Sequence, residues 1–348
     1  MSKQDKIRDF DPNGPGQLDL NIYGLPFTRE ESEIVLVSVP WEVTVSYGGG
    51  TLLGPESIKE ASLQVDLFDA DAPEAWKAGI FMTEPDLKLK KLSEASRLKA
   101  EKYIHALMEG ARQEDYADLI AEIDQACIQM IEFVKKETST ALHAGKVTGL
   151  VGGDHSTPLG FIQALSEQHA SFGILQIDAH MDLRRAYEGF TYSHASIMYN
   201  ALQIPQVKKL VQVGIRDYCA EEIEVAQKQG QRVEVFFDAQ LRNRLLEGDS
   251  WRTLCDEIVQ TLPEKVYLSF DIDGLDPVLC PNTGTPVPGG LSYQEAIYLI
   301  RKVVKSGRQL IGFDLNEVSP GQDDWDANVA SRLLFKLCVF AGISRGLF

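Results

Sequence analysis

Aspartate and histidine side chains follow several apolar runs of the sequence at the point where each run ends. In an extended segment, residues i and i+2 point to the same side, so pairs such as Asp178/His180 and Asp271/Asp273 would project together. Carboxylate and imidazole groups are common ligands of divalent metals in proteins. The polar clusters are Asp154-His155-Ser156, Asp178-Ala179-His180-Met181-Asp182, Asp271-Ile272-Asp273 and, after "LIGFDLN", Glu317.

The number of acidic groups indicates how many ions such a site would hold. Ionised carboxylates that share one place need a counter-charge, and the nearby sequence offers only Arg184 and Arg185. One catalytic ion that keeps open positions for substrate needs fewer than six ligands. Six side chains instead suit two ions roughly 3.5 Å apart, with carboxylates and a hydroxide bridging them. The donors suit two Mn²⁺ per chain best, with Ni²⁺, Co²⁺, Fe²⁺ or Zn²⁺ as alternatives. The six candidate ligands are His155, Asp178, His180, Asp182, Asp271 and Asp273.

A structural interpretation of the same clusters has to be weighed. A single Asp-x-His at the end of a strand is more often structural than metal-binding, and "GGDH" alone is more often a turn with a capping aspartate. Three such clusters at three separate strand ends are hard to explain by packing. The sequence therefore favours a binuclear metal site.

The apolar runs have the pattern of buried β-strands. They are nearly continuous rather than alternating in polarity, which is typical of strands buried on both faces of a parallel sheet. Helix-like segments such as 157–169 and 292–307 separate most of them, and this alternation predicts a parallel sheet with helices on both faces. In such a sheet, ligands bind beyond the carboxyl ends of the strands. The predicted strands cover 34–40, 146–153, 172–180, 208–216, 232–237, 265–273 and 309–318.

One segment interrupts the alternation of strands and helices. Residues 86–142 are charged and helix-prone, with almost no glycine or proline. Apolar residues recur at helical spacing, so we predict two consecutive helices with one stripe packed inward. The segment would be either a helical excursion on the flank of the sheet or an oligomer contact or lid over the site. The stripe consists of Leu119, Ile123, Cys127, Met130, Ile131 and Val134.

Composition excludes some classes of partner. The formal net charge of -17 argues against binding to nucleic acid or to an anionic membrane surface. The five cysteines are scattered and never have CxxC spacing, which indicates a reduced, cytoplasmic protein. The first residues show no signal peptide, and no apolar run approaches the about 18 residues of a membrane helix. We therefore expect a cytoplasmic protein with no membrane partner.

These motifs together resemble the ureohydrolase family of arginases, agmatinases and formimidoylglutamases. The resemblance implies an arginase-like α/β fold with three layers, α/β/α, and a central, mostly parallel sheet of about eight strands. It also implies a homo-oligomer, a trimer or a hexamer. Residues 86–142 are not part of the common pattern, so we expect a helical insertion in a single domain, 1–348. The matching blocks are "GGDHS" (152–156), "DAHMD" (178–182), "SHAS" (193–196), "SFDIDGLDP" (269–277), "TGTPVPGGLS" (283–292), "DLNEVSP" (314–320) and the glycine loop "SYGGGTLLGP" (46–55).

The resemblance also implies a role for each site residue. His194 would be the proton shuttle, Glu317 would bind the guanidinium or amidinium group, and Thr285 would line the substrate pocket. The implied metal ligands are His155 and Asp182 for one ion, His180 and Asp273 for the other, and Asp178 and Asp271 as bridges.

The chemistry of such a site is coherent without the family. Two cations lower the pKa of a bridging water, and the resulting hydroxide attacks a planar guanidinium carbon. The tetrahedral intermediate expels an amine, which needs a proton, and a histidine at the rim of the site suits that task. A carboxylate is a good partner for the paired N–H donors of the guanidinium. The predicted reaction releases urea and an amine.

The identity of the substrate is less constrained. The stretch "DLRRAYEGFTYSHAS" (182–196) departs from the arginase pattern, and Cys219 stands where arginases tend to have an aspartate for the α-amino group. Arg184 would either face the pocket as a partner for a substrate carboxylate or pair at the surface with an acidic residue such as Glu188. We favour an agmatinase-like substrate, with formimidoylglutamase, arginase, guanidinobutyrase or guanidine hydrolase activity as alternatives.

Two other classes of protein remain open at this point. A metal-dependent deacylase of the same fold would use one zinc ion and a catalytic tyrosine, which the second aspartate of each pair argues against. A non-catalytic regulator would not need a complete set of ligands together with His194. Metal content and urea release separate these classes.

Overall fold

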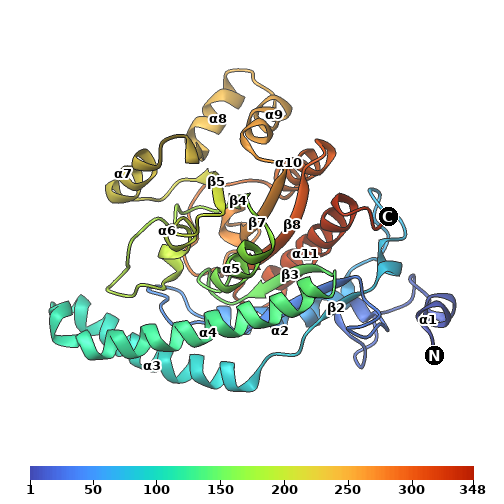
Figure 1. The fold of residues 1–348 in the computed structure, drawn as a ribbon, viewed down its shortest axis with the longest axis horizontal. Coiled ribbons are helices and arrows are strands. Elements are labelled where there is room, and N and C mark those ends of the chain that lie inside the picture. The colour runs from blue at the N-terminus through green and yellow to red at the C-terminus, as the bar shows by residue number, and fades with distance from the viewer.

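Eight strands form one sheet in the computed structural model, which describes residues 1–348 (Figure 1). The strand order is β2-β1-β3-β8-β7-β4-β5-β6, and every neighbouring pair is parallel. The predicted α/β fold with a parallel sheet is confirmed. The strands are β1 (Ile34–Val39), β2 (Ile80–Met82), β3 (Val147–Gly152), β4 (Phe172–Ile177), β5 (Val207–Ile215), β6 (Val233–Phe237), β7 (Lys265–Asp271) and β8 (Gln309–Asn316).

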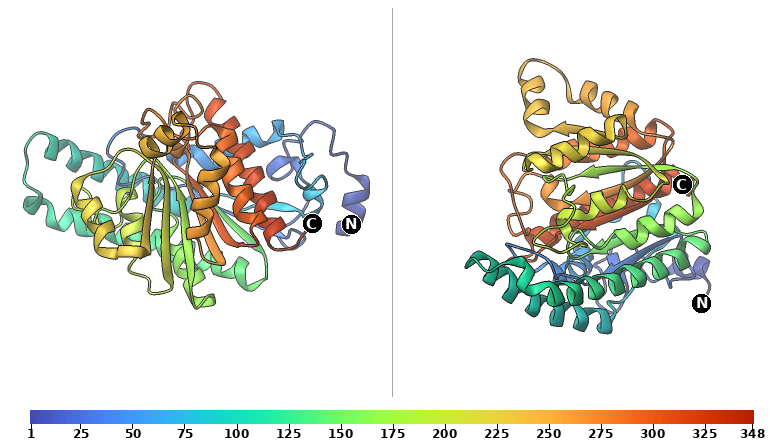
Figure 2. Two further views of the ribbon diagram at one scale, coloured as in Figure 1. Left: turned by 90° about the horizontal axis from the view of Figure 1, so that it is seen from above. Right: turned by 60° about the vertical axis from the view of Figure 1, so that its left-hand side comes forward.

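Helices cover both faces of this sheet, as the two turned views show (Figure 2). Successive side chains of a strand point to opposite faces, so Ile174 of β4 joins one hydrophobic cluster whereas Leu175 and Ile177 join the other. The helices are α1 (Lys3–Asp9), α2 (Gly54–Ala61), α3 (Leu87–Met108), α4 (Ala117–His143), α5 (Leu159–Gln168), α6 (Ile197–Ala201), α7 (Ala220–Gln229), α8 (Asp238–Leu246), α9 (Trp251–Thr261), α10 (Tyr293–Lys305) and α11 (Trp325–Ser344).

All seven predicted strands are present, most of them shorter than expected. For example, β4 ends at Ile177, because the polar residues after it leave the sheet to form the candidate site. The edge strand β2 was not predicted, since its three residues, Ile80–Met82, are too few to give a periodic signal.

The two predicted helices between residues 86 and 142 are also present, as α3 and α4. They form an antiparallel pair that runs along one side of the molecule and projects past the sheet (Figure 1). Ile123, Cys127 and Met130 of the predicted stripe are buried, whereas Leu119 is only partly buried. That this pair is an insertion into a single domain stays a prediction.

Helix α11 is long and apolar enough by composition to cross a membrane, although its sequence carries Arg332 and Lys336. Its most apolar window is 72% buried inside the protein, where the helix packs against β8 and α2. These properties are those of a core helix of the sheet.

Candidate metal centre and active site

The strand order explains how residues far apart in the sequence meet. Strands β3, β8, β7 and β4 are consecutive neighbours in the middle of the sheet, and the candidate site residues follow each of them. Asp271 pairs with Asn316 in the register of β7 and β8, and Ile177, just before Asp178, pairs with Phe270. The carboxyl ends of four adjacent parallel strands therefore deliver their side chains to one edge.

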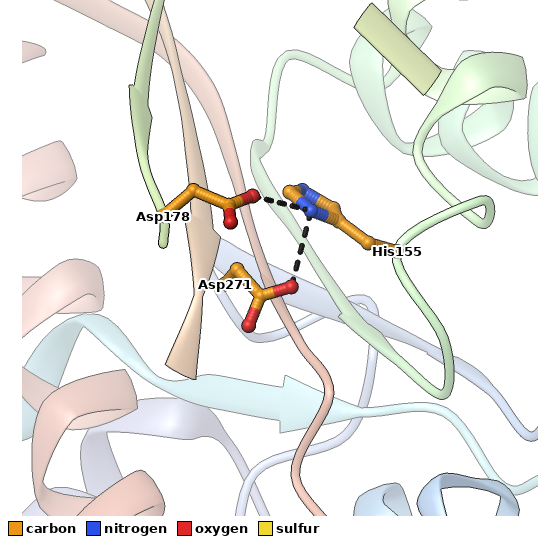
Figure 3. Close-up of side chains that lie close together, drawn as sticks. All are labelled: His155, Asp178 and Asp271. Carbon is orange, nitrogen blue, oxygen red and sulfur yellow. Dashed lines mark ion pairs between the residues drawn. The ribbon is translucent and has the colours of Figure 1, made fainter. Parts of the chain in front are cut away.

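His155 lies among three carboxylates at this edge. Its Nδ1 atom is 3.0 Å from Oδ2 of Asp178, 3.1 Å from Oδ2 of Asp182 and 3.2 Å from Oδ2 of Asp271. Figure 3 shows Asp178 and Asp271 converging on the ring from two strands. All four side chains are buried.

A divalent cation fits this arrangement. The Nδ1 atom of His155 is buried and has no hydrogen-bond partner, because none of the three nearby oxygens meets hydrogen-bond geometry. A buried polar atom of this kind is normally satisfied, and a metal ion between one nitrogen and several carboxylate oxygens satisfies all of them. His155, Asp178 and Asp271 form one group of side chains that could hold an ion.

A second group of side chains lies beside the first. His180 Nδ1 is 3.0 Å from Oδ2 of Asp273 and 3.6 Å from Oδ1 of Asp178. The two groups share Asp178, whose Oδ2 faces His155 and whose Oδ1 faces His180. All six predicted ligands therefore lie together at one edge of the sheet.

The two predicted bridging residues differ in their surroundings. Asp271 belongs only to the group around His155, and its Oδ1 accepts a hydrogen bond of 2.9 Å from the backbone of Asp273. Asp178 faces both histidines. The bridging role of Asp271 stays a prediction.

The electrostatics of the side chains without an ion agree with a cation site. Burial alone would lower the pKa of His155, but the carboxylates of Asp178, Asp182 and Asp271 outweigh it and raise that pKa well above its ordinary value. Burial, together with the charge of Asp178, raises the pKa of Asp182 to about 7. Without an ion, bound protons therefore offset the negative charge of the crowded carboxylates, and a cation at the same place could offset that charge instead.

The backbone is strained at two of the predicted site residues. Asp182 has a φ of 54° and Glu317 a φ of 61°, in the left-handed region that side chains other than glycine rarely adopt. Strain of this kind concentrates at functional sites. Glu317 is buried, its Oε1 accepts a hydrogen bond of 2.7 Å from the backbone N–H of His155, and burial together with the charge of Asp154 raises its pKa well above the usual range.

Two residues behind His155 were not predicted from the sequence. The hydroxyl of Ser269 lies 2.9 Å from Nε2 of His155 and donates a hydrogen bond of 3.1 Å to Oδ1 of Asp314. Both are fully buried. The signal was available for Ser269, which precedes Asp271 by two residues and therefore points to the same side of β7.

A cavity of about 140 Å³ opens beside the cluster of candidate metal ligands. Five predicted site residues line it, whereas His155, Asp178, Asp271, Asp273 and Glu317 do not. No sequence pattern indicated the aromatic and acidic residues that complete the wall. The lining consists of Ser46, His180, Asp182, Arg184, Tyr187, His194, Ala195, Asp217, Tyr218, Glu222 and Thr285.

His194 is partly buried at the wall of this cavity. Burial, followed by the charges of His180 and His155, lowers its pKa to about 3. Its ring stands edge-on to the ring of Tyr187, with centroids 6.1 Å apart. A neutral imidazole at this place can accept a proton and then donate it.

Arg184 also lies on the cavity wall rather than in an ion pair with Glu188. Its guanidinium carbon is 4.7 Å from the centroid of the Tyr187 ring, and its Nε is 3.9 Å from Oε2 of Glu222. Glu222 is buried and accepts hydrogen bonds from the backbone N–H groups of Leu183 and Cys219. The stacking leaves the N–H groups of Arg184 free for a ligand.

Comparison with known proteins identifies the family. The sequence profile of the arginase family matches residues 32–339. The chain belongs to the arginase family. This arginase-family member is 32% identical, over 320 residues, to N(1)-aminopropylagmatine ureohydrolase of Thermus thermophilus, a match that covers 91% of this chain and 93% of the relative.

Two further matches bear on this arginase-family chain. Guanidinobutyrase of Pseudomonas aeruginosa is 32% identical over 230 residues, which cover 63% of this chain and 68% of the relative. The crystal structure of a hypothetical agmatinase from Burkholderia thailandensis superposes with a TM-score of 0.72 at 22% identity, covering 99% of this chain and 98% of the other. The protein therefore has the arginase fold and is a hydrolase of amidino C–N bonds, which sets aside the deacylase and regulator alternatives.

Proposed function

We propose that this protein is a binuclear-metal amidinohydrolase that releases urea from a guanidino compound of the agmatine type. The observation that carries the proposal is the position of Asp178, which turns one carboxylate oxygen toward His155 and the other toward His180. Beside this cluster, the cavity presents His194 and Thr285. Candidate metal ligands, a candidate proton carrier and room for a small substrate lie side by side, and this arrangement supports the proposal.

Six side chains would hold two divalent cations, with Mn²⁺ as the first choice because oxygen donors predominate. When bound, the two ions would supply Lewis acidity and a hydroxide nucleophile at neutral pH. The proposed ligands are His155 and Asp182 for one ion, His180 and Asp273 for the other, and Asp178 and Asp271 shared between them.

The other site residues would bind the substrate and move the proton. His194 would donate a proton to the amine nitrogen of the tetrahedral intermediate, because that nitrogen must be protonated before the C–N bond breaks and the amine departs. Glu317 would accept N–H bonds from the guanidinium, since one of its oxygens is engaged by the backbone of His155 and the other is directed toward Gly284. Thr285, next to Gly284, would contact the substrate from the cavity wall.

The charges of the cavity wall favour a substrate with a cationic tail. Apart from the proposed ligand Asp182, the wall carries two carboxylates, Asp217 and Glu222, and one guanidinium, Arg184. Glu222 and the ring of Tyr187 already compensate part of the charge of Arg184. The name of the Thermus thermophilus relative, an aminopropylagmatine ureohydrolase, supports the same class of substrate.

A second candidate substrate carries a carboxylate on its tail. Arg184 makes no side-chain hydrogen bond, and its stacking on Tyr187 leaves a planar fork that matches a carboxylate. The Pseudomonas aeruginosa guanidinobutyrase is a relative whose name implies such a substrate. 4-Guanidinobutyrate is therefore the alternative to agmatine.

We also propose that the enzyme works in the cytoplasm as a homo-oligomer, a trimer or a hexamer, without a nucleic-acid or membrane partner. The five unpaired cysteines support a reducing compartment. The net charge of -17 disfavours polyanionic partners.

A screen for urea release tests the proposal. The protein is loaded with Mn²⁺ or Ni²⁺ and offered agmatine, aminopropylagmatine, 4-guanidinobutyrate, guanidine and L-arginine, with Asp178→Asn as the inactive control; formimidoylglutamate, whose hydrolysis gives formamide and not urea, is assayed separately for formamide. We expect urea from agmatine or aminopropylagmatine with the highest kcat/KM. Release of urea from none of these compounds with either metal would contradict the proposed function, and a preference for 4-guanidinobutyrate would replace agmatine by the second candidate.

A further inference from the structure

A tight turn contributes Tyr187 to the wall of the cavity. Tyr187 and Phe190 exchange two backbone hydrogen bonds, of 3.1 Å and 2.9 Å. Between them, Glu188 has a φ of 51° and Gly189 a φ of 87°. Two consecutive residues with positive φ are the signature of a type I′ turn, and a glutamate tolerates this conformation poorly, so the turn requires support from its surroundings.

The turn determines where two functional side chains lie. The ring of Tyr187 is 4.7 Å from the guanidinium carbon of Arg184 and 6.1 Å, centroid to centroid, from the ring of His194. Both neighbours line the cavity, one as a candidate contact for the substrate tail and the other as the candidate proton carrier. A shift of the turn would therefore move both.

The α3–α4 hairpin holds this turn from behind. The hydroxyl of Tyr103 on α3 donates a hydrogen bond of 2.9 Å to the carbonyl of Glu188, and its ring packs edge-on against Phe190 with centroids 5.5 Å apart. Asp124 on α4 accepts a hydrogen bond of 3.0 Å from the backbone N–H of Thr191 through Oδ1. Tyr103 is fully buried, so it has no access to the substrate.

The same hairpin also holds a second segment beside the cavity. Arg97 on α3 donates hydrogen bonds to the backbone carbonyls of Val43 and Val45 and lies 3.8 Å from the carboxylate of Glu42. The next residue, Ser46, lines the cavity. The hairpin itself contributes no residue to the lining, which distinguishes it from a lid.

We propose that the α3–α4 hairpin is the positioning element of the substrate cavity, with Tyr103 and Asp124 as positioning residues for the 187–191 turn. The inference rests on the proposed function, because it explains how that site is kept in shape. Backbone groups of a turn that loses its outside hydrogen bonds sample other conformations, and small misplacements of groups around a substrate are costly for turnover.

The test removes single hydrogen bonds and leaves the packing intact. Tyr103→Phe removes only the bond to Glu188. Its matched control is Tyr116→Phe, because the ring of Tyr116 packs 5.1 Å from that of Tyr103 but makes none of these contacts with the turn. Asp124→Ala removes the bond to Thr191, whereas Asp124→Asn keeps an oxygen that can accept it.

We expect Tyr103→Phe and Asp124→Ala each to lower kcat/KM about fivefold, which corresponds to the loss of one net hydrogen bond. KM should rise in both variants, and their metal content should equal that of the parent. The ratio of activities toward agmatine and 4-guanidinobutyrate should also change, because Arg184 moves with the turn. Tyr116→Phe and Asp124→Asn should match the parent. A simple loss of folded enzyme would lower kcat alone and leave KM and the substrate ratio unchanged.

Hydrogen exchange of the backbone amides of residues 187–191 gives a readout that does not depend on turnover. We expect faster exchange in Tyr103→Phe and Asp124→Ala and no change in Tyr116→Phe. Parental kinetics and exchange in both disrupted variants would overturn the inference while leaving the proposed function in place. If the parent releases no urea from any guanidino compound, the proposed function fails, and the exchange rates still decide whether the hairpin holds the turn.

Discussion

The hydroxyl oxygen of Ser269 lies 2.9 Å from Nε2 of His155, on the side of the imidazole ring opposite to the three carboxylates. This contact decides which nitrogen of His155 is free to bind a metal. If Nε2 is occupied by a hydrogen bond, Nδ1 is the atom left for the ion. Partners of this kind orient the ligating histidine and tune its basicity.

Replacing Ser269 should therefore weaken metal binding without removing a ligand. We expect Ser269→Ala to lower metal affinity by about 10- to 100-fold, measured by titration of metal into the metal-free protein. Ser38→Ala is the matched control, since Ser38 is a buried serine of β1 whose hydroxyl has no hydrogen-bond partner. Equal affinities of Ser269→Ala and the parent would remove this serine from the metal site.

Asp178 and Asp271 should differ in their effect on metal content. Asp178 faces both histidines, so Asp178→Asn should weaken both ion positions, whereas Asp271→Asn should weaken chiefly the position beside His155. Metal analysis after dialysis should then give less metal in Asp178→Asn than in Asp271→Asn, and less than two ions per chain in both. Full loading and unchanged activity of Asp271→Asn would contradict its role as a ligand.

His194 should matter for turnover and not for metal content. It lines the cavity but belongs to neither ligand group. We expect His194→Asn to keep both ions and to lose about 10²-fold or more in kcat, since general acid–base catalysis contributes roughly 10²–10⁴-fold. Steady-state kinetics and metal analysis on the same preparation check this. Loss of metal in the variant would make His194 a ligand instead.

Stability of the metal-free protein should fall as pH rises from about 4 toward and beyond neutrality. The folded-state pKa of Asp182 is raised to about 7, so ionisation of this carboxyl opposes folding increasingly between its unfolded pKa near 4 and pH 7. The raised pKa of His155 acts in the same direction. The stabilisation from its positive charge is fully present below the unfolded pKa of about 6.5, and it is lost as the pH rises from there through the higher folded-state pKa.

The loss of stability with rising pH is measured from the melting temperature of the protein in the presence of a chelator, across this pH range. Asp182→Asn should show a shallower decline than the parent, and saturating Mn²⁺ should reverse the slope in the parent, because bound cations replace the protons and their binding strengthens with pH. A metal-free parent that becomes more stable from pH 5 to pH 8, by the same amount as Asp182→Asn, would contradict this account of the site.

Arg184 should discriminate between substrate tails. We expect Arg184→Ala to cost 4-guanidinobutyrate about 1–3 kcal/mol in kcat/KM, because a carboxylate would lose a charged partner, and to leave agmatine unchanged or improved. Arg185→Ala is the control, since the Arg185 side chain is 62% exposed and pairs with Glu221. Equal effects of Arg184→Ala on both substrates would show that Arg184 does not contact the tail.

The sequence by itself determined the elements and the ligand types. Continuous apolar runs predicted seven of the eight strands. A strand that is buried on both faces has apolar residues at nearly every position, so it appears in the sequence as an uninterrupted apolar run. The clusters after those runs identified His155, Asp178, His180 and Asp271 as members of one site, since the carboxyl ends of parallel strands lie at one edge. That inference needed only local patterns and a general rule of sheet architecture.

Only the tertiary structure decided which residues are neighbours. The order β3-β8-β7-β4 sets His155 next to Asp271 and Asp178, although 116 and 23 positions separate them in sequence. Tyr103 behind the 187–191 turn carries no local signal of its role, and the strand alternation that aligns Ser269 with Asp271 does not identify His155 as its partner. Their contacts arise from the packing of segments distant in sequence, and short-range periodicity does not encode the partners that packing selects.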